Sequence, residues 1–336
     1  MQRTANVVIH GAGVVGASVA WHLAQRGVRD VVVVDRSPEL GSGSTSKATG
    51  GFRAQFATET NVRLSLLARE ELQVAQHGYL FLATSAEELE TLRAAQAVQH
   101  ACGLAEARMV SPEEARELNP AIADDSIAGG AFCPTDGFIR PMDVLRQYVD
   151  GAQAMGVQFI LGEPVEVSAG ITVNAKGAWA GAPVTPLRRN VAATIETDLL
   201  PPSMPMTIWS GDWYHLRVRD GRVLLLWPDE PPDDEVWLTR VRAFTDARVT
   251  CLRDVPVDYC WTGLYEMSPD EHALLGRVPG TDDQYVAIGN SGHGVMHAPA
   301  LGRLLAEMIV DGAAHSMDVS ALDPGRFGNL GVRWRK

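Results

Sequence analysis

Three glycines near the start of the chain have the spacing that brings a peptide backbone against a phosphate group. Gly11, Gly13 and Gly16 fall in the run Gly-Ala-Gly-Val-Val-Gly, directly after a short apolar stretch. The first glycine allows a tight turn off a strand, the second lets the backbone approach a pyrophosphate, and the third lets a helix pack on the strand. Because a helix N-terminus has unpaired N–H groups and partial positive charge, the pattern predicts a dinucleotide site.

The elements that must position these glycines are recognisable on both sides of them. Residues 6–10 form a β-branched run typical of a buried parallel strand, residues 15–26 have helical apolar spacing, and residues 30–35 predict the next strand. Asp35 ends that second strand, where a carboxylate accepts hydrogen bonds from ribose hydroxyls and repels a 2′-phosphate. The neighbouring residues that we predict to contact the cofactor are Val14, Val15 and Arg36.

The glycine motif alone fits both NAD and FAD, and two further segments favour FAD. Residues 41–56 are rich in small residues and contain Lys47 and Arg53, which suits a chain that wraps the flavin pyrophosphate and ring. Near the C-terminus, a predicted strand over 285–289 leads through a Gly-rich loop into a predicted helix over 299–310. Its N-terminus could face the pyrimidine end of the flavin. An NAD(P)-dependent dehydrogenase stays the alternative.

Composition excludes several classes of protein. A hydrophobic content of 46% with 21% charged residues is typical of a globular protein, and a net charge of −12 argues against nucleic-acid binding. The four cysteines show no C-x-x-C pairing, so we expect no metal site. The chain has no leader-like start and no long apolar run. We therefore expect a cytoplasmic protein without a transmembrane segment, and peripheral membrane association stays open.

Seven stretches occur in an order typical of one flavoprotein family. They are V-V-I-H-G-A-G-V-V-G (7–16), S-K-A-T-G-G-F-R-A-Q-F (46–56), G-Y-L-F-L-A-T (78–84), F-C-P-T-D-G-F (132–138), V-N-A-K-G-A-W-A (173–180), L-Y-E-M-S-P-D (264–270) and S-G-H-G-V-M-H-A-P-A-L-G (291–302). Over nearly its whole length the chain thus resembles the D-amino-acid oxidase/sarcosine oxidase superfamily of FAD-dependent amine oxidoreductases. It is most similar to the branch of the sarcosine oxidase β-subunit and the L-proline dehydrogenase β-subunit.

The resemblance implies an α/β fold in which a Rossmann-like FAD-binding domain is interleaved with a substrate domain built on a mostly antiparallel sheet. The implied FAD-binding segments are 1–75, 138–185 and 265–336, and the substrate segments are 76–137 and 186–264. The residue pattern agrees where it predicts a helix over 140–155, a strand over 157–160 and a hairpin over 214–227 that turns at Asp220-Gly221.

Three stretches, around 74–77, 168–171 and 181–184, are shorter than the family leads us to expect. Either the protein is trimmed there or segments are absent from this sequence, and the residues leave both explanations open.

The resemblance also implies which residues lie at the flavin. Arg53 is the candidate cation for stabilising the reduced flavin, His293 belongs to the loop at flavin O2, and Tyr265 is a candidate border of the substrate pocket. An ordinary surface arginine, an incidental imidazole and a packed tyrosine are the alternatives, and Lys47 could equally be solvated. The remaining predicted cofactor contacts are Ser44, Thr45, Lys47, Thr49, Gly50, Gly51, Val165, Ala175, Gly177, Trp179, Gly292, Gly294, Val295 and Met296.

Four positions depart from the monomeric sarcosine oxidases that the chain resembles. Met296 stands where those enzymes place a lysine for the substrate carboxylate, and Phe56 lies near their second arginine. Arg53, Tyr214, His215 or Arg217 would then hold the carboxylate, unless the substrate differs. Gly263 lies near the position of the flavin-linking cysteine, and the strand over 223–227 lacks the lysine that assists oxygen. The resemblance thus implies non-covalent FAD and favours a dehydrogenase over an oxidase.

The function that follows is FAD-dependent oxidation of a secondary or N-methyl amino acid, resembling sarcosine or proline, by hydride transfer to flavin N5. The alternative keeps FAD but makes the chain a non-catalytic or electron-transfer subunit of a larger complex. The expected partners are a small-molecule amino acid or amine and, in a homo- or hetero-oligomer, an electron-accepting subunit.

Overall fold

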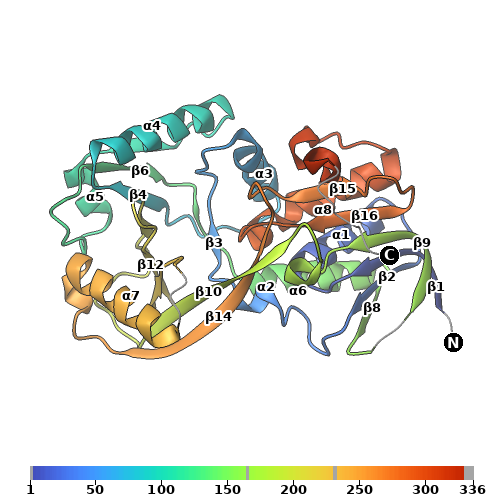
Figure 1. Ribbon diagram of the computed structural model, residues 1–336, viewed down its shortest axis with the longest axis horizontal. Coiled ribbons are helices and arrows are strands. Elements are labelled where there is room, and N and C mark those ends of the chain that lie inside the picture. Colours follow the sequence, from blue (N-terminus) through green and yellow to red (C-terminus); the bar gives the residue numbers. More distant parts are fainter. Residues whose placement is uncertain (1–2, 164–165, 230–232, 329–336) are drawn as a thin grey trace.

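Two sheets stand side by side in the molecule, each with its own helices (Figure 1). The computed structural model describes residues 3–163, 166–229 and 233–328. No helix in these ranges is long and apolar enough to cross a membrane.

The first sheet is mostly parallel and includes the strand that precedes the glycine motif. Its six strands lie in the order β15-β16-β9-β1-β2-β8, and only β15 runs antiparallel to its neighbour. The strands are β1 (Arg3–His10), β2 (Val31–Asp35), β8 (Gln158–Leu161), β9 (Val167–Asn174), β15 (Leu274–Arg277) and β16 (Gln284–Ile288). His10 pairs with Val34 on one side and with Asn174 on the other, so the carboxyl ends of β1, β2 and β9 meet at one edge.

Helices α1, α6 and α8 cover this sheet, with α1 packed against both of the others (Figure 1). Their bounds are α1 (Val14–Gln25), α6 (Pro141–Ala154) and α8 (Gly294–Asp311). Helix α1 is buried on almost all sides, which agrees with the apolar residues that occur all round it. Gly302 of α8 brings its backbone against Ser18 of α1, and the Ser18 hydroxyl donates to the Ala298 carbonyl at 2.7 Å. Helix α3 (Glu59–Arg69) packs on α8 from the other side.

The second sheet has eight strands in the order β14-β10-β13-β12-β11-β4-β6-β5, and every neighbouring pair except β11 and β4 is antiparallel. The strands are β4 (Tyr79–Ala83), β5 (Arg108–Val110), β6 (Gly129–Cys133), β10 (Thr185–Thr194), β11 (Met206–Trp209), β12 (His215–Arg219), β13 (Arg222–Leu226) and β14 (Val257–Met267). The predicted hairpin is confirmed: β12 and β13 pair, and both Asp220 and Gly221 at the turn have positive φ.

Three capped helices surround this second sheet, and their caps explain where they begin. Ser85, Ser111 and Asp233 each accept a hydrogen bond from the backbone N–H three residues on, which satisfies one unpaired donor of the first turn. The helices are α4 (Ala86–Ala101), α5 (Pro112–Leu118) and α7 (Asp234–Arg248). The core between sheet and helices includes the fully buried rings of Trp209, Tyr214 and Trp237.

Short elements and two long strands join the halves. β3 (Gly51–Phe52) pairs with β7 (Gly137–Phe138) near α2 (Ser44–Lys47), and the 3-10 turns are η1 (Gly177–Trp179), η2 (Thr250–Leu252), η3 (Ser320–Leu322) and η4 (Pro324–Phe327). β10 and β14 run together from one half to the other (Figure 1). The connection from β8 to β9 spans only 162–166, although a crossover between parallel strands usually takes a dozen or more residues.

The mixed α/β architecture agrees with the predicted fold class, whereas the assignment of segments to two domains stays a prediction. One helix boundary was wrong. We expected the last helix to begin at Pro299, since proline is favoured in a first turn. In the structure α8 begins at Gly294 and Pro299 lies inside it. The proline ring has no N–H, so the carbonyl of Val295 has no helical donor there.

Candidate active site

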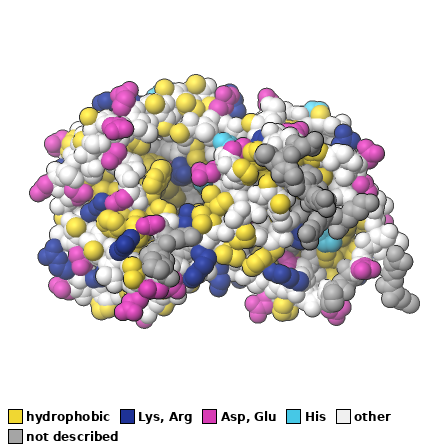
Figure 2. Space-filling view, in the orientation of Figure 1, with side chains coloured by type: hydrophobic (Ala, Val, Ile, Leu, Met, Phe, Trp, Pro, Cys, Tyr) yellow, Lys and Arg dark blue, Asp and Glu magenta, His cyan; other side chains and the backbone are white. Residues whose placement is uncertain are grey.

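A cavity of about 1180 Å³ lies between the two sheets, and the space-filling view shows the furrow between the two halves (Figure 2). It extends from the glycine turn after β1 to the β-strands of the second sheet. Of the residues that we predicted as cofactor contacts or catalytic groups, all but two line it. Gly16 does not, and Val165 lies outside the described residues.

The glycine turn is held close to the end of β9. Gly11 has a φ of +117°, and a Cβ added there would collide with the carbonyl oxygen of Ala175. A Cβ added at Gly16 would likewise collide with the carbonyl oxygen of Gly11, so the role of Gly16 is to let α1 pack closely on the strand. Gly13 is the N-cap of α1 and has no capping side chain, and the Thr45 hydroxyl accepts a hydrogen bond from the Val14 N–H at 3.2 Å. The remaining backbone donors of the first turn face the cavity.

Asp35 fixes the edge of this turn and keeps accepting capacity toward the cavity. Its Oδ2 accepts a hydrogen bond from the Ala12 N–H at 2.7 Å, and its Oδ1 accepts from the Ser37 N–H at 2.9 Å. A carboxylate has about four lone-pair sites, so both oxygens can also accept ribose hydroxyls. Beside it, the Arg36 guanidinium lies 4.6 Å from the ring centre of Trp179, which is half exposed.

The segment from Ser44 to Gly51 follows the cavity wall because β14 and β7 hold it there. The Ser44 hydroxyl donates to the Leu264 carbonyl at 2.6 Å, and the Trp261 indole donates to the Lys47 carbonyl at 2.9 Å. Farther along, a Cβ at Gly51 would collide with the hydroxyl of Tyr79. The absence of a side chain at Gly51 therefore permits close packing of the segment on Tyr79, whereas the wrapping of a flavin by this segment stays a prediction.

Arg53 is a cation held against aromatic rings. Its guanidinium lies 3.8 Å from the ring centre of Phe56 and 5.6 Å from that of Phe81, and it donates to the Gln55 carbonyl. It makes no ion pair with any residue in the described ranges. The nearby Asp136 carboxylate instead accepts from the Ala54 N–H at 2.7 Å. Burial lowers the pKa of Arg53, so an anion in the cavity would be a favourable partner.

Two histidines at the start of α8 stay neutral near this cation. The His293 ring packs edge-on against Phe56, and the His297 Nε2 lies 2.9 Å from the Ser65 hydroxyl. Burial, with Arg53 nearby, lowers the pKa of His293 well below its ordinary value and that of His297 to about 3. These rings therefore contribute hydrogen bonds and packing, without positive charge, at neutral pH.

Tyr265 and Glu266, at the end of β14, contact the loop that leads into α8. Gly292 has a φ of +88°, and a Cβ there would collide with the Tyr265 ring. Glu266 accepts hydrogen bonds from the Asn290 side chain at 2.6 Å and from the Gly289 N–H at 3.0 Å. Burial raises the pKa of Glu266 to about 7, against the lowering effect of these hydrogen bonds.

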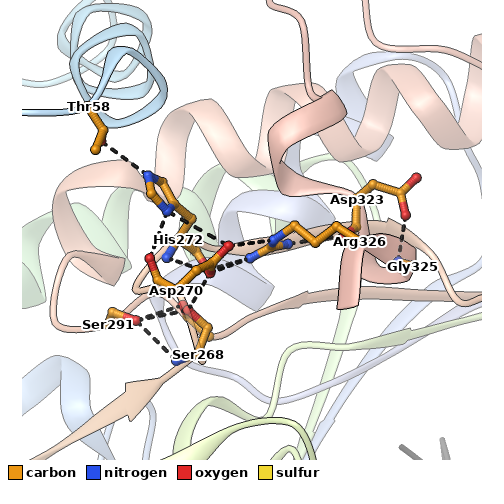
Figure 3. A network of polar contacts seen from close by, with 9 residues as sticks. Thr58, Ser268, Asp270, His272, Ser291, Asp323, Gly325 and Arg326 are labelled. Atoms are coloured by element: carbon orange, nitrogen blue, oxygen red, sulfur yellow. Dashed lines mark hydrogen bonds and ion pairs between the residues drawn. The ribbon is translucent and has the colours of Figure 1, made fainter. Parts of the chain in front are cut away.

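A polar network supports the same loop from behind (Figure 3). Arg326 donates two hydrogen bonds to Asp270, both 2.8 Å long, and His272 lies 3.1 Å from the Thr58 hydroxyl. The Ser291 hydroxyl accepts from the Ser268 N–H at 3.1 Å. The C-terminal turn η4 is thereby linked to the loop that precedes α8.

Residues of the second sheet and its connections line the far end of the cavity, and we predicted few of them from the sequence. Its lining includes Tyr79, Met206, Ile208, Trp213, His215, Leu226 and Trp227. Burial lowers the pKa of His215 to about 4, so this imidazole is neutral. Two of the side chains that we considered for a substrate carboxylate do not reach the cavity. The Tyr214 hydroxyl is hydrogen-bonded to Thr245 in the core, and Arg217 is buried over Phe138, where it donates to the Thr49 carbonyl.

Comparisons with known proteins agree with this geometry. The family model described as FAD dependent oxidoreductase matches residues 6–308. An FAD-dependent oxidoreductase domain-containing protein 1 from Xenopus laevis is 25% identical, and the alignment covers 96% of this chain and 82% of that protein. The mitochondrial dimethylglycine dehydrogenase of Rattus norvegicus is 30% identical over 390 residues, with 96% of this chain and 45% of the rat protein covered. This chain thus spans less than half of the rat enzyme.

Among solved structures, the L-proline dehydrogenase from P. horikoshii superimposes with a TM-score of 0.87 at 27% identity, with 97% of this chain and 98% of that one covered. The glycine oxidase from Geobacillus kaustophilus shares the fold, with a TM-score of 0.82 at 20% identity over 97% of this chain and 99% of that one.

The alignment with the rat dimethylglycine dehydrogenase spans 390 positions, more than the 336 residues of this chain. The rat protein therefore has residues within the aligned region that are missing from this chain.

Proposed function

Because this chain belongs to the FAD dependent oxidoreductase family, we propose that it holds FAD without a covalent bond and oxidises a secondary or N-methyl amino acid. The observation that supports this most is the continuity of the cavity. It begins at the turn of Gly11 and Asp35 and ends at Arg53, a half-buried cation near Asp136 that makes no ion pair within the described ranges. The names of the similar proteins, which act on dimethylglycine and L-proline, support the substrate class.

The residues present fit FAD. The close approach of Gly11 to β9 leaves room for a pyrophosphate, and Asp35 can accept from a ribose. In the first turn of α1 the Val14 N–H is paired with the Thr45 hydroxyl, and the backbone donors that follow it are available to the phosphates. In this proposal Thr45 and Lys47 line the middle of the cofactor, and the first turn of α8 lies at its pyrimidine end. Bound FAD supplies a two-electron acceptor that takes hydride at N5 from the carbon beside the amine nitrogen.

The protein's part in the reaction is positioning and charge. Arg53 supplies positive charge where the substrate carboxylate or the reduced cofactor would otherwise stay unbalanced. Tyr265 borders the entrance, and the rings of Trp213 and Trp227 exclude water from the reacting carbon. Neutral His215 orients polar groups of the substrate through hydrogen bonds.

The cavity wall supports the proposal of non-covalent binding, because it offers no thiol for a link to the flavin. None of the four cysteines lines the cavity, and Gly263, which does, packs its backbone against the stem of Lys47. Denaturation in acid should therefore release all of the flavin into the supernatant. Yellow protein that remains in the pellet would contradict this part of the proposal.

A second candidate is an FAD subunit that only passes electrons. Phe56 and Met296 favour it, because both are buried apolar residues near positions where the resemblance implied cations for a carboxylate. In that case the chain would act with an electron-accepting subunit in a hetero-oligomer.

Anaerobic reduction separates the two candidates. The protein, loaded with FAD, is mixed without oxygen with sarcosine, proline, N,N-dimethylglycine and glycine, and absorbance near ~450 nm is followed, since the bound flavin is the chromophore. We expect bleaching by at least one N-alkyl or cyclic amino acid and weaker bleaching by glycine. If none of these amines bleaches a flavin that dithionite does reduce, the enzymatic proposal is overturned. Reoxidation by an artificial acceptor should be faster than by oxygen.

A further inference from the structure

Asp35 and Glu266 are the two half-buried acidic residues on the cavity wall, and Glu266 is the one beside the loop that leads into α8. Glu163 and Glu271 are exposed, whereas Glu266 is half-buried and accepts hydrogen bonds through both oxygens, from Gly289 and Asn290. It makes no ion pair within the described ranges. A half-buried carboxylate without a cation is held by neutral donors alone, so its charge is sensitive to any further charge placed in the cavity.

Its position links it to the first turn of α8. The Ser291 N–H donates to the Glu266 carbonyl at 3.0 Å, and a Cβ added at Gly294 would lie 3.6 Å from the Glu266 carboxylate. A Cβ at Gly177 would lie 3.9 Å from the same carboxylate on its other side. Glu266 thus sits beneath the loop that we propose for the pyrimidine end of the flavin.

Asn290 provides this carboxyl group with two alternative arrangements. Its Nδ2 donates to Glu266, while its Oδ1 is buried without a hydrogen-bond partner. A 180° rotation of the carboxamide would place Oδ1 where Nδ2 stands, so a protonated Glu266 could donate to it. The pair therefore has one arrangement in which the carboxylate accepts from Asn290 and another in which the neutral acid donates to it.

The surrounding charged and titratable groups do not hold Glu266 in one state. They come from the strand itself, from β10, from α2, from the residue before η1 and from the start of α8, and they are Tyr265, Arg189, Lys47, Lys176 and His293. Arg189 packs over the Tyr265 ring, and His293 is neutral for the reason given above. Burial places the pKa of Glu266 at about 7, where a modest added charge changes its protonation.

We propose that Glu266 and Asn290 form a proton-uptake site coupled to reduction of the flavin, an inference that rests on the proposed placement of the flavin ring. The C–H bond of the substrate breaks, and its hydride brings two electrons and one proton to the cofactor, which gains negative charge. Glu266 is a carboxylate beside the oxidised cofactor and takes one proton from solvent to offset that charge. Amine and oxidised cofactor are the only redox partners required.

The test measures the flavin midpoint potential against pH in the holoprotein, by equilibration with reference dyes and dithionite and without any amine. In the wild-type protein the potential should fall more steeply with pH around neutrality than in Glu266→Gln. In alkaline buffer wild-type Glu266 is charged. At the same solution potential, as reported by the reference dye, the variant should then show a roughly tenfold higher ratio of reduced to oxidised flavin than the wild-type protein. For a two-electron couple that ratio corresponds to about 30 mV.

The variant should fold, because glutamine has the same shape and a rotated Asn290 can pair with its amide. FAD affinity, measured by quenching of flavin fluorescence, should therefore change only a few-fold. Glu163→Gln is the matched control, since it removes the same charge at the Asp35 end of the cavity. Its potential should follow the wild-type curve at every pH.

Proton uptake by the wild-type protein needs no variant. Photoreduction in weakly buffered solution with an indicator dye should show an additional proton taken up near neutral pH that disappears in strongly alkaline buffer. Uptake that is constant across this range, or a Glu266→Gln curve that coincides with the wild-type curve, overturns the inference. If these shifts occur while no amine reduces the flavin, the proposed function fails and this inference stands.

Discussion

At the scale of single residues, the site combines the half-buried cation Arg53 with neutral imidazoles. Arg53 lies over Phe56, with His293 against the same ring, and burial lowers the pKa of Arg53, His293 and His297. Charges in such an environment interact more strongly than in water, since little solvent screens them. A single substitution of Arg53 should therefore affect chemistry more than folding.

Arg53→Gln should slow amine-driven flavin reduction by roughly 10²-fold, the usual effect of removing one donor to developing negative charge. Arg53→Lys should recover part of the rate, because it restores charge without the planar fork. Stopped-flow absorbance measures both rates. Arg63→Gln, on the exposed face of α3, is the control and should leave the rate unchanged. A normal rate in Arg53→Gln would remove Arg53 from the site.

Gly11→Ala should prevent FAD binding and destabilise the fold, because the new methyl group would meet the Ala175 carbonyl as well as the unfavourable φ. Gly27→Ala is the matched control, since Gly27 also has positive φ but has nothing within 4 Å. The control should be less stable by about 1–2 kcal/mol and still bind FAD. Equal behaviour of the two variants in urea unfolding and FAD titration would show that crowding at Gly11 is unimportant.

At the scale of elements, the loop before α8 is supported from two directions. β14 supplies Tyr265 and Glu266 in front, and the network of Asp270, His272 and Arg326 lies behind (Figure 3). The turn η4 therefore helps to hold the loop before α8, although it lies far from the glycine motif in sequence.

Arg326→Ala should destabilise the protein by about 1–2 kcal/mol, as expected for charge-assisted hydrogen bonds to a partly exposed carboxylate. Burial alone would raise the pKa of Asp270, but the hydrogen bonds from Arg326 and His272 lower it overall. This contribution is present above the unfolded pKa of about 3.9 and is lost as pH falls through the folded value.

The difference in unfolding free energy between wild type and Arg326→Ala should thus be constant near neutral pH and shrink in acid. Arg277→Ala removes an exposed ion pair with Asp282 and should cost little at any pH. Urea denaturation at several pH values makes the comparison. A difference between wild type and Arg326→Ala that grows in acid would contradict the assignment.

At the scale of the whole molecule, the cavity is a shared surface of the two halves. Its wall takes residues from β1, α2, β10, β14 and the start of α8, which are far apart in the chain. A ligand that fills it should therefore stabilise most of the fold at once.

Removal of FAD should lower the temperature of unfolding, and FAD at 100 times its Kd should restore about 2.7 kcal/mol of stability. Thermal unfolding at a series of FAD concentrations measures this. NAD at the same concentrations is the control and should give no shift. Stabilisation by NAD rather than by FAD would support the dehydrogenase alternative and contradict the cofactor assignment.

The sequence by itself determined the features that depend on local backbone geometry. The spacing of Gly11, Gly13 and Gly16, the acid at the end of β2, and the turn at Asp220-Gly221 each reflect what a few consecutive residues can adopt. The family resemblance added the small residues of 44–51 to the predicted site, and all of them except Ser46 line the cavity.

Only the tertiary structure decided which side chains meet at the far end of the cavity. Tyr79, His215 and Trp213 line the same cavity as Arg53 because β4, β11 and β12 are adjacent in the second sheet, an arrangement that no local pattern encodes. Tertiary contacts also explain why Arg217 points into the core rather than the cavity. They likewise determine that Pro299 lies inside α8 and that Glu266 is hydrogen-bonded to Asn290. Each outcome depends on contacts between residues distant in sequence, where packing outweighs local preference.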